Sequence, residues 1–196
     1  MTGYQIKKAL ESFRIIVDTR EQATNKLEAR LKDFGCPYER ATLDYGDYTF
    51  NVTLADGVLC DTSVKVAPKV AIERKMDIDE LALCLTHERV RFLKELERAK
   101  DKNAKMYLLI ENGSWDDIIN GNYKSWINSR TFLSNICFLQ AHYDLNIVFC
   151  KDYNAGIVIK TILYQEAREY IKLKGSNNEK SNSIDTRVSK IKTLDR

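Results

Sequence analysis

Three charged residues directly follow a short apolar run in the segment VAIERKMDID, which spans residues 70–79. The run at 70–72 has the composition of a buried strand, where a charge without a partner is costly. Side chains two residues apart share a face of a strand, so Glu73 and Lys75 point one way and Arg74 points the other. An acid and a lysine held together at a strand end can bind a metal ion and polarise a water molecule.

Two more acids lie at expected strand ends. Asp18 closes the apolar run RIIVD, and Asp47 follows a glycine turn where another strand begins. The spacing Asp-x25-Glu-x-Lys, from Asp47 to Lys75, is the pattern of the nuclease group written PD-(D/E)xK. Cleaving a phosphodiester requires oxygen ligands for Mg²⁺, which helps to generate hydroxide from bound water. Plainer interpretations stay open, because Asp47 could shape a turn, Asp18 could cap a helix, and E-x-K could be an exposed strand end.

The chain alternates apolar runs with amphipathic segments, which predicts one α/β domain with a mixed central sheet flanked by helices. We expect helices over residues 4–12, 26–35, 78–85, 88–100, 130–143 and 155–173. We expect strands over residues 14–18, 38–43, 47–54, 58–66, 69–75, 105–111 and 145–150. The turn ADG at 55–57 predicts a hairpin.

The residues around these acids resemble the nuclease domain of the XPF (ERCC4 domain) family of structure-specific endonucleases. Three motifs follow one another in that family's order: V-D-x-R-E at 17–21, G-D-Y at 46–48 and E-R-K-x-x-x-D at 73–79. The segment YLLIENG (107–113) resembles the family's next strand, and the similarity spans roughly residues 13–170. The resemblance implies a restriction-endonuclease-like core, cleavage of branched DNA such as flaps, forks and junctions, and a role in DNA repair or recombination.

The same resemblance implies roles for individual residues. Asp47 and Glu73 are expected to hold Mg²⁺, with Mn²⁺ as its substitute and Asp18 close by, and Lys75 to assist the attack. The other matched positions support the site or contact phosphate: Arg20, Glu21, Arg74 and Asp79. Family members work as dimers that pair through C-terminal helices, so we expect a homodimer with the helix at 155–173 near its interface. Its apolar residues cover more than one face.

The predicted helix at 88–100 carries a basic face. Arg91, Lys94 and Arg98 recur at helical spacing, with Arg89 beside them, and this stripe either follows a phosphate backbone or is an ordinary solvated face. The segment resembles the arginine-bearing helix of the family, although Glu88 replaces the usual glycine. Trp115 and Trp126, on either side of GNYKS, could stack on bases or anchor the core and its loops.

Composition limits the remaining possibilities. The 196 residues carry a net charge of only +3, which permits binding to nucleic acid without requiring it. The absence of a long apolar run and of a signal peptide predicts a cytoplasmic protein without a membrane span. Five scattered cysteines indicate thiols packed in the core rather than a zinc site.

The sequence predicts a nuclease domain over residues 1–174 and a flexible polar tail over 175–196. The family's usual helix-hairpin-helix and helicase modules are not expected here, so the chain resembles small standalone bacterial and phage forms. We predict a Mg²⁺-dependent endonuclease that binds DNA, with a replication or recombination protein as a further partner. The alternative is a catalytically weak or inactive DNA-binding accessory protein with the same fold.

Overall fold

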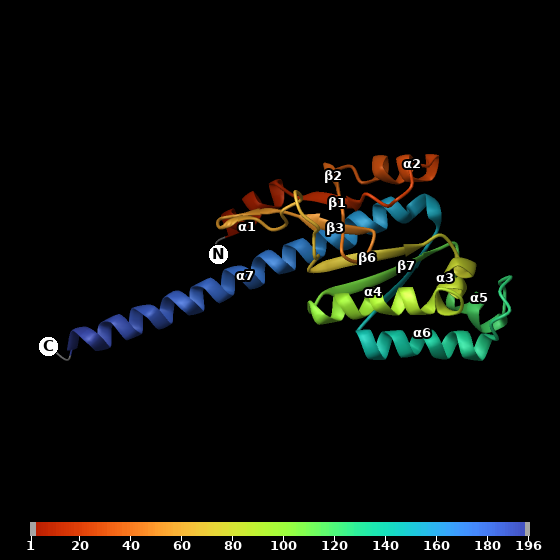
Figure 1. Cartoon of the computed structure of the whole chain (residues 1–196). Coiled ribbons are helices and arrows are strands. Elements are labelled where there is room, and N and C mark those ends of the chain that lie inside the picture. Colours follow the sequence, from red (N-terminus) through yellow and green to blue (C-terminus); the bar gives the residue numbers. More distant parts are fainter. Residues whose placement is uncertain (1–2, 195–196) are drawn as a thin grey trace.

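The computed structural model describes the backbone of residues 3–194 and the side chains of residues 3–174. Its centre is a mixed six-stranded sheet with the order β2-β1-β3-β6-β7-β8 (Figure 1). The strands are β1 (Arg14–Asp18), β2 (Tyr38–Ala41), β3 (Tyr48–Asn51), β6 (Val70–Lys75), β7 (Lys105–Glu111) and β8 (Asn146–Cys150). Strands β1 and β2, and β6, β7 and β8, run parallel to one another, whereas β3 is antiparallel to both of its neighbours. The predicted α/β fold with a mixed sheet is confirmed.

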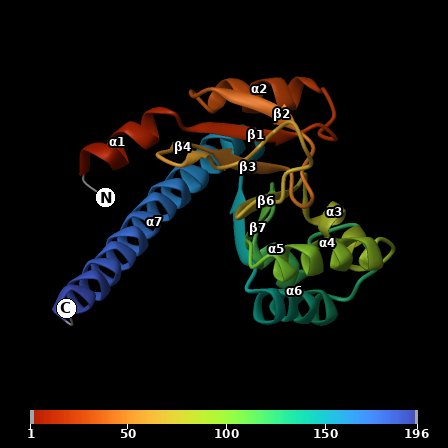
Figure 2. The ribbon, with the colours of Figure 1, turned by 60° about the vertical axis from the view of Figure 1, so that its left-hand side comes forward.

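Helices cover both faces of this sheet (Figure 2). They are α1 (Gly3–Glu11), α2 (Asn25–Asp33), α3 (Ile78–Leu85), α4 (Arg89–Asp101), α5 (Trp115–Asn120), α6 (Ser129–Tyr143) and α7 (Ala155–Leu194). Apolar side chains of α3, α4, α5 and α6 form one core with β6 and β7. Those of α1, α2 and α7 form a second core on the other face. Strands β6, β7 and β8 therefore send alternate side chains into the two cores.

Polar side chains fix where several helices begin. The hydroxyl of Thr24 accepts a hydrogen bond from the Leu27 amide at 3.2 Å, and the carboxylate of Asp77 accepts one from the Glu80 amide at 2.8 Å. Such caps satisfy amides that have no partner inside the helix. They start α2 and α3 directly after the strand ends at which the predicted acids lie.

The segment predicted as a strand over 58–66 is mostly irregular. The hairpin is confirmed, because β4 (Thr53–Leu54) pairs with β5 (Gly57–Val58). Beyond it, the side chain of Asn51 bonds the backbone of Cys60, and Asp61 accepts bonds from the amide and hydroxyl of Ser63. These local bonds curl the backbone away from an extended ladder. The short helix α5 was not predicted; six residues are too few to show a helical period.

Helix α7 is longer than the sequence predicts. The sequence places the end of this helix at residue 173, whereas the helix continues across Gly175 to Leu194 and projects from the body (Figures 1 and 2). One glycine lowers helix stability by about 1 kcal/mol without ending a helix, and no proline follows that would break it. Ile159 and Leu163 begin a row of buried side chains that packs against the sheet.

The cysteines are all free thiols, and they differ in burial. Cys84 is packed in the core, as predicted, whereas Cys137 is exposed on α6, so its predicted burial is wrong. Within the described part of the chain, no helix is both long and apolar enough to cross a membrane.

Candidate active site

The strand register brings the predicted acids into one row. Tyr48 of β3 lies opposite Ile72 of β6, so Asp47 is level with Glu73 on the neighbouring strand. Tyr48 also lies opposite Val17 of β1, and the Asp18 amide donates a 2.8 Å hydrogen bond to the Asp47 carbonyl. Residues directly opposite one another project from the same face of a sheet. The backbones of three acids far apart in sequence thus lie level at one end of the sheet.

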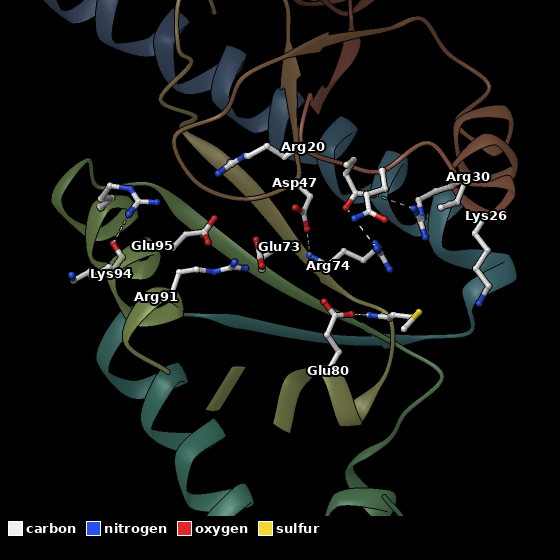
Figure 3. A pocket seen from close by; sticks show the side chains of 15 residues that line it. Arg20, Lys26, Arg30, Asp47, Glu73, Arg74, Glu80, Arg91, Lys94 and Glu95 are labelled. Carbon is white, nitrogen blue, oxygen red and sulfur yellow. Dashed lines mark hydrogen bonds and ion pairs between the residues drawn. The ribbon is translucent and has the colours of Figure 1, made fainter. Parts of the chain in front are cut away.

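A cavity of about 740 Å³ opens at this end, and we call it the strand-end cavity (Figure 3). Its carboxylates are Glu21, Asp47, Glu73, Glu80 and Glu95. Its basic side chains are Arg20, Lys26, Arg30, Arg74, Arg91, Lys94 and Arg98. These charged side chains lie on both faces of the sheet, and some of them belong to α2 and α4. The cavity therefore combines an acidic floor with a cationic rim.

Asp47 and Glu73 form the acidic floor. The Asp47 carboxylate accepts a 2.7 Å hydrogen bond from the Arg74 amide, which fixes its orientation. Burial and the carboxylates of Glu73 and Glu21 raise the pKa of Asp47 well above its ordinary value. Burial also raises the pKa of Glu73, although Lys75 opposes this effect. Two carboxylates in one buried place are costly to ionise together unless a cation joins them.

Lys75 lies behind Glu73 and does not line the cavity. Its ammonium group is 2.5 Å from a Glu73 carboxylate oxygen and 5.2 Å from the ring centre of Phe92. Burial alone would lower the pKa of Lys75, but the Glu73 carboxylate outweighs burial and raises this pKa. The lysine therefore stays charged and is paired with a carboxylate of the floor.

Asp18 is buried away from the cavity, with 1 % of its surface exposed. Arg20 pairs with it through side chain and backbone, and the Leu43 amide donates to it at 3.3 Å. The Arg20 guanidinium also donates to the Leu43 carbonyl at 3.0 Å. The arrangement positions Arg20 at the rim and ties β1 to the segment after β2. The structure thus does not bring Asp18 together with Asp47 and Glu73 as a ligand set.

A network of buried charges lies on the opposite face of the sheet. Arg30 of α2 is 2.8 Å from Glu111 at the end of β7, and Arg74 is 3.4 Å from the same carboxylate. Glu21 lies 3.6 Å from Arg74 and accepts a 3.0 Å hydrogen bond from the Tyr48 hydroxyl. The predicted residues Glu21 and Arg74 are therefore joined in a network that fastens α2 to the strand ends.

Two further predicted residues lie outside the strand-end cavity. The Asp79 carboxylate accepts hydrogen bonds from the amides of Lys124 and Ser125, at 2.7 and 3.1 Å. Arg89 donates a 3.1 Å bond to Asn135 of α6. Asp79 thus holds the segment between α5 and α6, and Arg89 connects two helices of one layer.

The rest of the basic stripe faces the cavity. Figure 3 shows Arg91 extending from α4 toward Glu73. Lys94 also lines the cavity, whereas Arg98 donates to the Asp44 carbonyl at 2.9 Å and to that of Lys94 at 3.2 Å. Arg91 pairs with Glu88 at 3.4 Å but its side chain is 80 % exposed, so Arg91 and Lys94 are the cations of α4 most available to a ligand.

Some site residues were not predicted from the sequence. Glu95 lies within the basic stripe, where helical spacing could have placed it on the same face, and its carboxylate accepts a 2.8 Å bond from the Gly46 amide. Glu111 directly follows an apolar run in KMYLLIE, as Glu73 does in VAIERK, and this shared pattern could have indicated it. Arg30 gave no comparable signal, because its partner lies 81 residues away.

The donor set of the floor fits a hard divalent cation. Mg²⁺ commonly takes one or two protein carboxylates and completes its shell with water and substrate phosphate. Asp47 and Glu73 could provide those carboxylates. Among the side chains that the structure describes, no group of three or more acidic, histidine or cysteine residues has the arrangement of a metal site. A site with two carboxylates and several waters is the arrangement that these residues allow.

Comparison with known proteins identifies the family. The family model described as ERCC4 domain matches residues 17–159. The chain belongs to the ERCC4 domain family. None of the curated protein sequences is significantly similar to it.

The ERCC4 domain fold is also found in two solved structures. XPF from Aeropyrum pernix is 16 % identical and has a TM-score of 0.56, with 83 % of this chain and 69 % of that chain covered. The same protein in a complex with DNA is 17 % identical with a TM-score of 0.55, over 80 % and 65 % of the two chains. This chain thus spans about two thirds of XPF. The likeness confirms the restriction-endonuclease-like fold predicted for the ERCC4 domain.

The charge network provides a stability prediction. Glu111→Leu leaves Arg30 buried without its nearest carboxylate, so we expect the free energy of unfolding to fall by about 3–5 kcal/mol. Arg30→Met combined with Glu111→Leu removes both charges and should restore most of that stability, since Arg74 keeps Glu21 as its partner. Urea unfolding of the three proteins measures this. A double variant as unstable as Glu111→Leu alone would contradict the role given to the pair.

Proposed function

We propose that the chain is a Mg²⁺-dependent endonuclease that hydrolyses phosphodiester bonds in branched or single-strand-containing DNA. One observation carries the proposal: Asp47 and Glu73 lie level on neighbouring strands at the floor of a cavity that cationic side chains surround. Membership of the ERCC4 domain family supports it, as does the structural likeness to an XPF that is described in a complex with DNA.

The chain's own residues divide the work as follows. Asp47 and Glu73 would hold the ion, with the Arg74 amide orienting the first and the Lys75 ammonium the second. When bound, the ion supplies stabilisation of the charge developing on phosphorus and acidifies a water molecule. Arg91 and Lys94 would bind phosphates on either side of the scissile bond, because both line the cavity from the facing helix and Arg91 extends toward Glu73.

The first test of this proposal removes the ligand charges. Asp47→Asn and Glu73→Gln change charge with little change in volume, so we expect each to lower cleavage by roughly 100-fold or more while folding is retained. Cleavage is measured in Mg²⁺ on labelled single strands, duplexes, flaps and four-way junctions. The control Asp56→Asn removes an equal charge from the exposed β4–β5 turn and should cleave normally.

The outcomes separate the two candidate functions. A floor variant that cleaves at the wild-type rate would refute the assigned ligands. Wild-type protein that binds these DNAs but cleaves none of them would favour the accessory protein without catalysis. Binding is measured in Ca²⁺, whose looser coordination supports binding but activates water poorly.

A second test concerns the basic rim. We expect Arg91→Gln combined with Lys94→Gln to weaken DNA binding and to flatten its dependence on salt, by about 0.9 in slope for each phosphate that the protein no longer neutralises. The matched control, Arg89→Gln with Lys100→Gln, removes the same charge from α4 at residues that bond α6 instead. Titrations of labelled duplex at several salt concentrations compare them. Equal slopes for both double variants would rule out the rim as a phosphate site.

We also propose a homodimer with α7 at or near its two-fold axis. Packing within the chain covers one face of α7, but Ile157 and Leu173 are 55 % and 65 % exposed. A dimer would place two basic rims on one substrate and raise the effective concentration of the second rim. Light scattering at micromolar concentration should give twice the 22.7 kDa of one chain. A mass of 22.7 kDa that neither concentration nor DNA changes would exclude the dimer.

A further inference from the structure

We propose that Trp126 is a stacking platform for an unpaired base of a DNA strand that leaves the strand-end cavity. This inference rests on the proposed function and deepens it, because it names the structural feature of DNA that the chain would recognise. It gives a role to the loop at 121–128, between α5 and α6, which extends at the right-hand edge of Figure 1.

The two tryptophans lie in opposite surroundings. Trp115 is partly buried against the core and meets the ring of Phe149 edge-on, with 5.2 Å between ring centres. Trp126 has a relative exposure of 102 %, so its indole is open to solvent. An indole is a large apolar surface to leave in water, and its flat face is the kind of surface on which bases stack in single-strand-binding proteins.

Hydrogen bonds hold the loop at 121–128 in place on both sides of Trp126. The Asp79 carboxylate accepts the amides of Lys124 and Ser125, and the Tyr123 hydroxyl donates to the Ile127 carbonyl at 2.8 Å. The base of the loop is therefore held in place before any ligand arrives. A platform that is already ordered loses less conformational entropy on binding than a mobile loop would.

The surface around Trp126 is continuous with the strand-end cavity. Trp126 lines a second cavity of about 570 Å³. Met76 and Glu80 line both this cavity and the strand-end cavity. Met76 is 46 % exposed and Leu83, which also lines the second cavity, is 42 % exposed, so both offer apolar surface to a ligand there. A strand with its phosphate at Asp47 and Glu73 could thus extend over Met76 to the indole.

The charges of the second cavity favour a base over a phosphate. Three acids, Asp77, Asp79 and Glu80, line it against one lysine, Lys124, and each acid already accepts hydrogen bonds from backbone amides. Their negative charge disfavours a phosphate, while a neutral, planar base does not meet that repulsion. In the interior of a duplex the base faces are covered by neighbouring bases, so an unpaired base presents its face to Trp126 far more readily than a paired one.

Intrinsic fluorescence tests this directly, since the chain has only two tryptophans. In Trp115→Phe, Trp126 is the sole emitter, and its emission should be quenched by a dT oligonucleotide or a forked duplex but not by a blunt duplex. In Trp126→Phe, only Trp115 emits, and no quenching is expected. Both titrations are made in Ca²⁺, which supports binding but activates water poorly, so cleavage plays no part in the result.

Affinity provides the second measurement. Anisotropy of the labelled DNAs should show that Trp126→Ala weakens binding of the single strand and the fork by roughly 5- to 150-fold, the range for stacking of one base. Binding of the blunt duplex should be unchanged, and Trp126→Phe should retain part of the affinity. An equal weakening for duplex and single strand would refute recognition of an unpaired base.

The measurements distinguish failure of the Trp126 platform from failure of the proposed function. Unquenched Trp126 emission in a complex that anisotropy shows to have formed would overturn the platform and leave DNA binding intact. Absence of binding to every DNA would overturn the platform together with the proposed function. In that case the exposed indole would have to serve another partner, such as a protein.

Discussion

One close approach joins the two halves of the sheet, and it is made between the turn before β3 and strand β6. The Asp47 amide donates to the Ile72 carbonyl at 2.8 Å, and the Thr49 hydroxyl donates to the Val70 carbonyl at 2.6 Å. Gly46, at φ +72°, makes this approach possible, since a Cβ there would lie only 2.8 Å from the Cβ of Ala71. Because of this close approach, Asp47 and Glu73 lie opposite each other on neighbouring strands.

Helix α4 depends on the same close approach. Phe92 and Leu96 are buried in the core on one side of the helix. On the cavity side, Glu95 accepts the Gly46 amide, and Arg98 binds the carbonyl and carboxylate of Asp44. The polar face of α4 is thus docked to the glycine turn itself. The helix is packed against the core on one side and hydrogen-bonded to the glycine turn on the other. These contacts fix the position of the rim cations relative to Asp47 and Glu73.

At this end of the sheet, charged side chains are paired differently on the two faces. On the α2 side, Arg30 and Arg74 compensate Glu111 and Glu21 within the chain. On the α4 side, Glu73 is paired with Lys75, whereas at Asp47 the neighbouring acids outweigh the opposing charge of Lys75. The uncompensated negative charge is therefore concentrated on one side of the strand ends. Such a difference between neighbouring groups is characteristic of sites that bind cations or carry out chemistry.

The sequence by itself determined which faces the critical residues occupy. Alternation in VAIERK put Glu73 and Lys75 on one side of a strand, and helical spacing put Arg91 and Lys94 on one side of a helix. These are local consequences of backbone geometry, with periods of 2 and 3.6 residues. For the same reason the order of strands and helices, and the family motifs, could be read without a structure.

Only the tertiary structure decided which partner each side chain has. Asp18 looked equivalent to Asp47, yet Arg20 and the Leu43 amide occupy its carboxylate and remove it from the floor. Glu111 finds its cation 81 residues away, and Trp115 and Trp126, close in sequence, differ completely in burial. Contacts between residues so far apart depend on sheet register and on helix docking, and no local period encodes either of them.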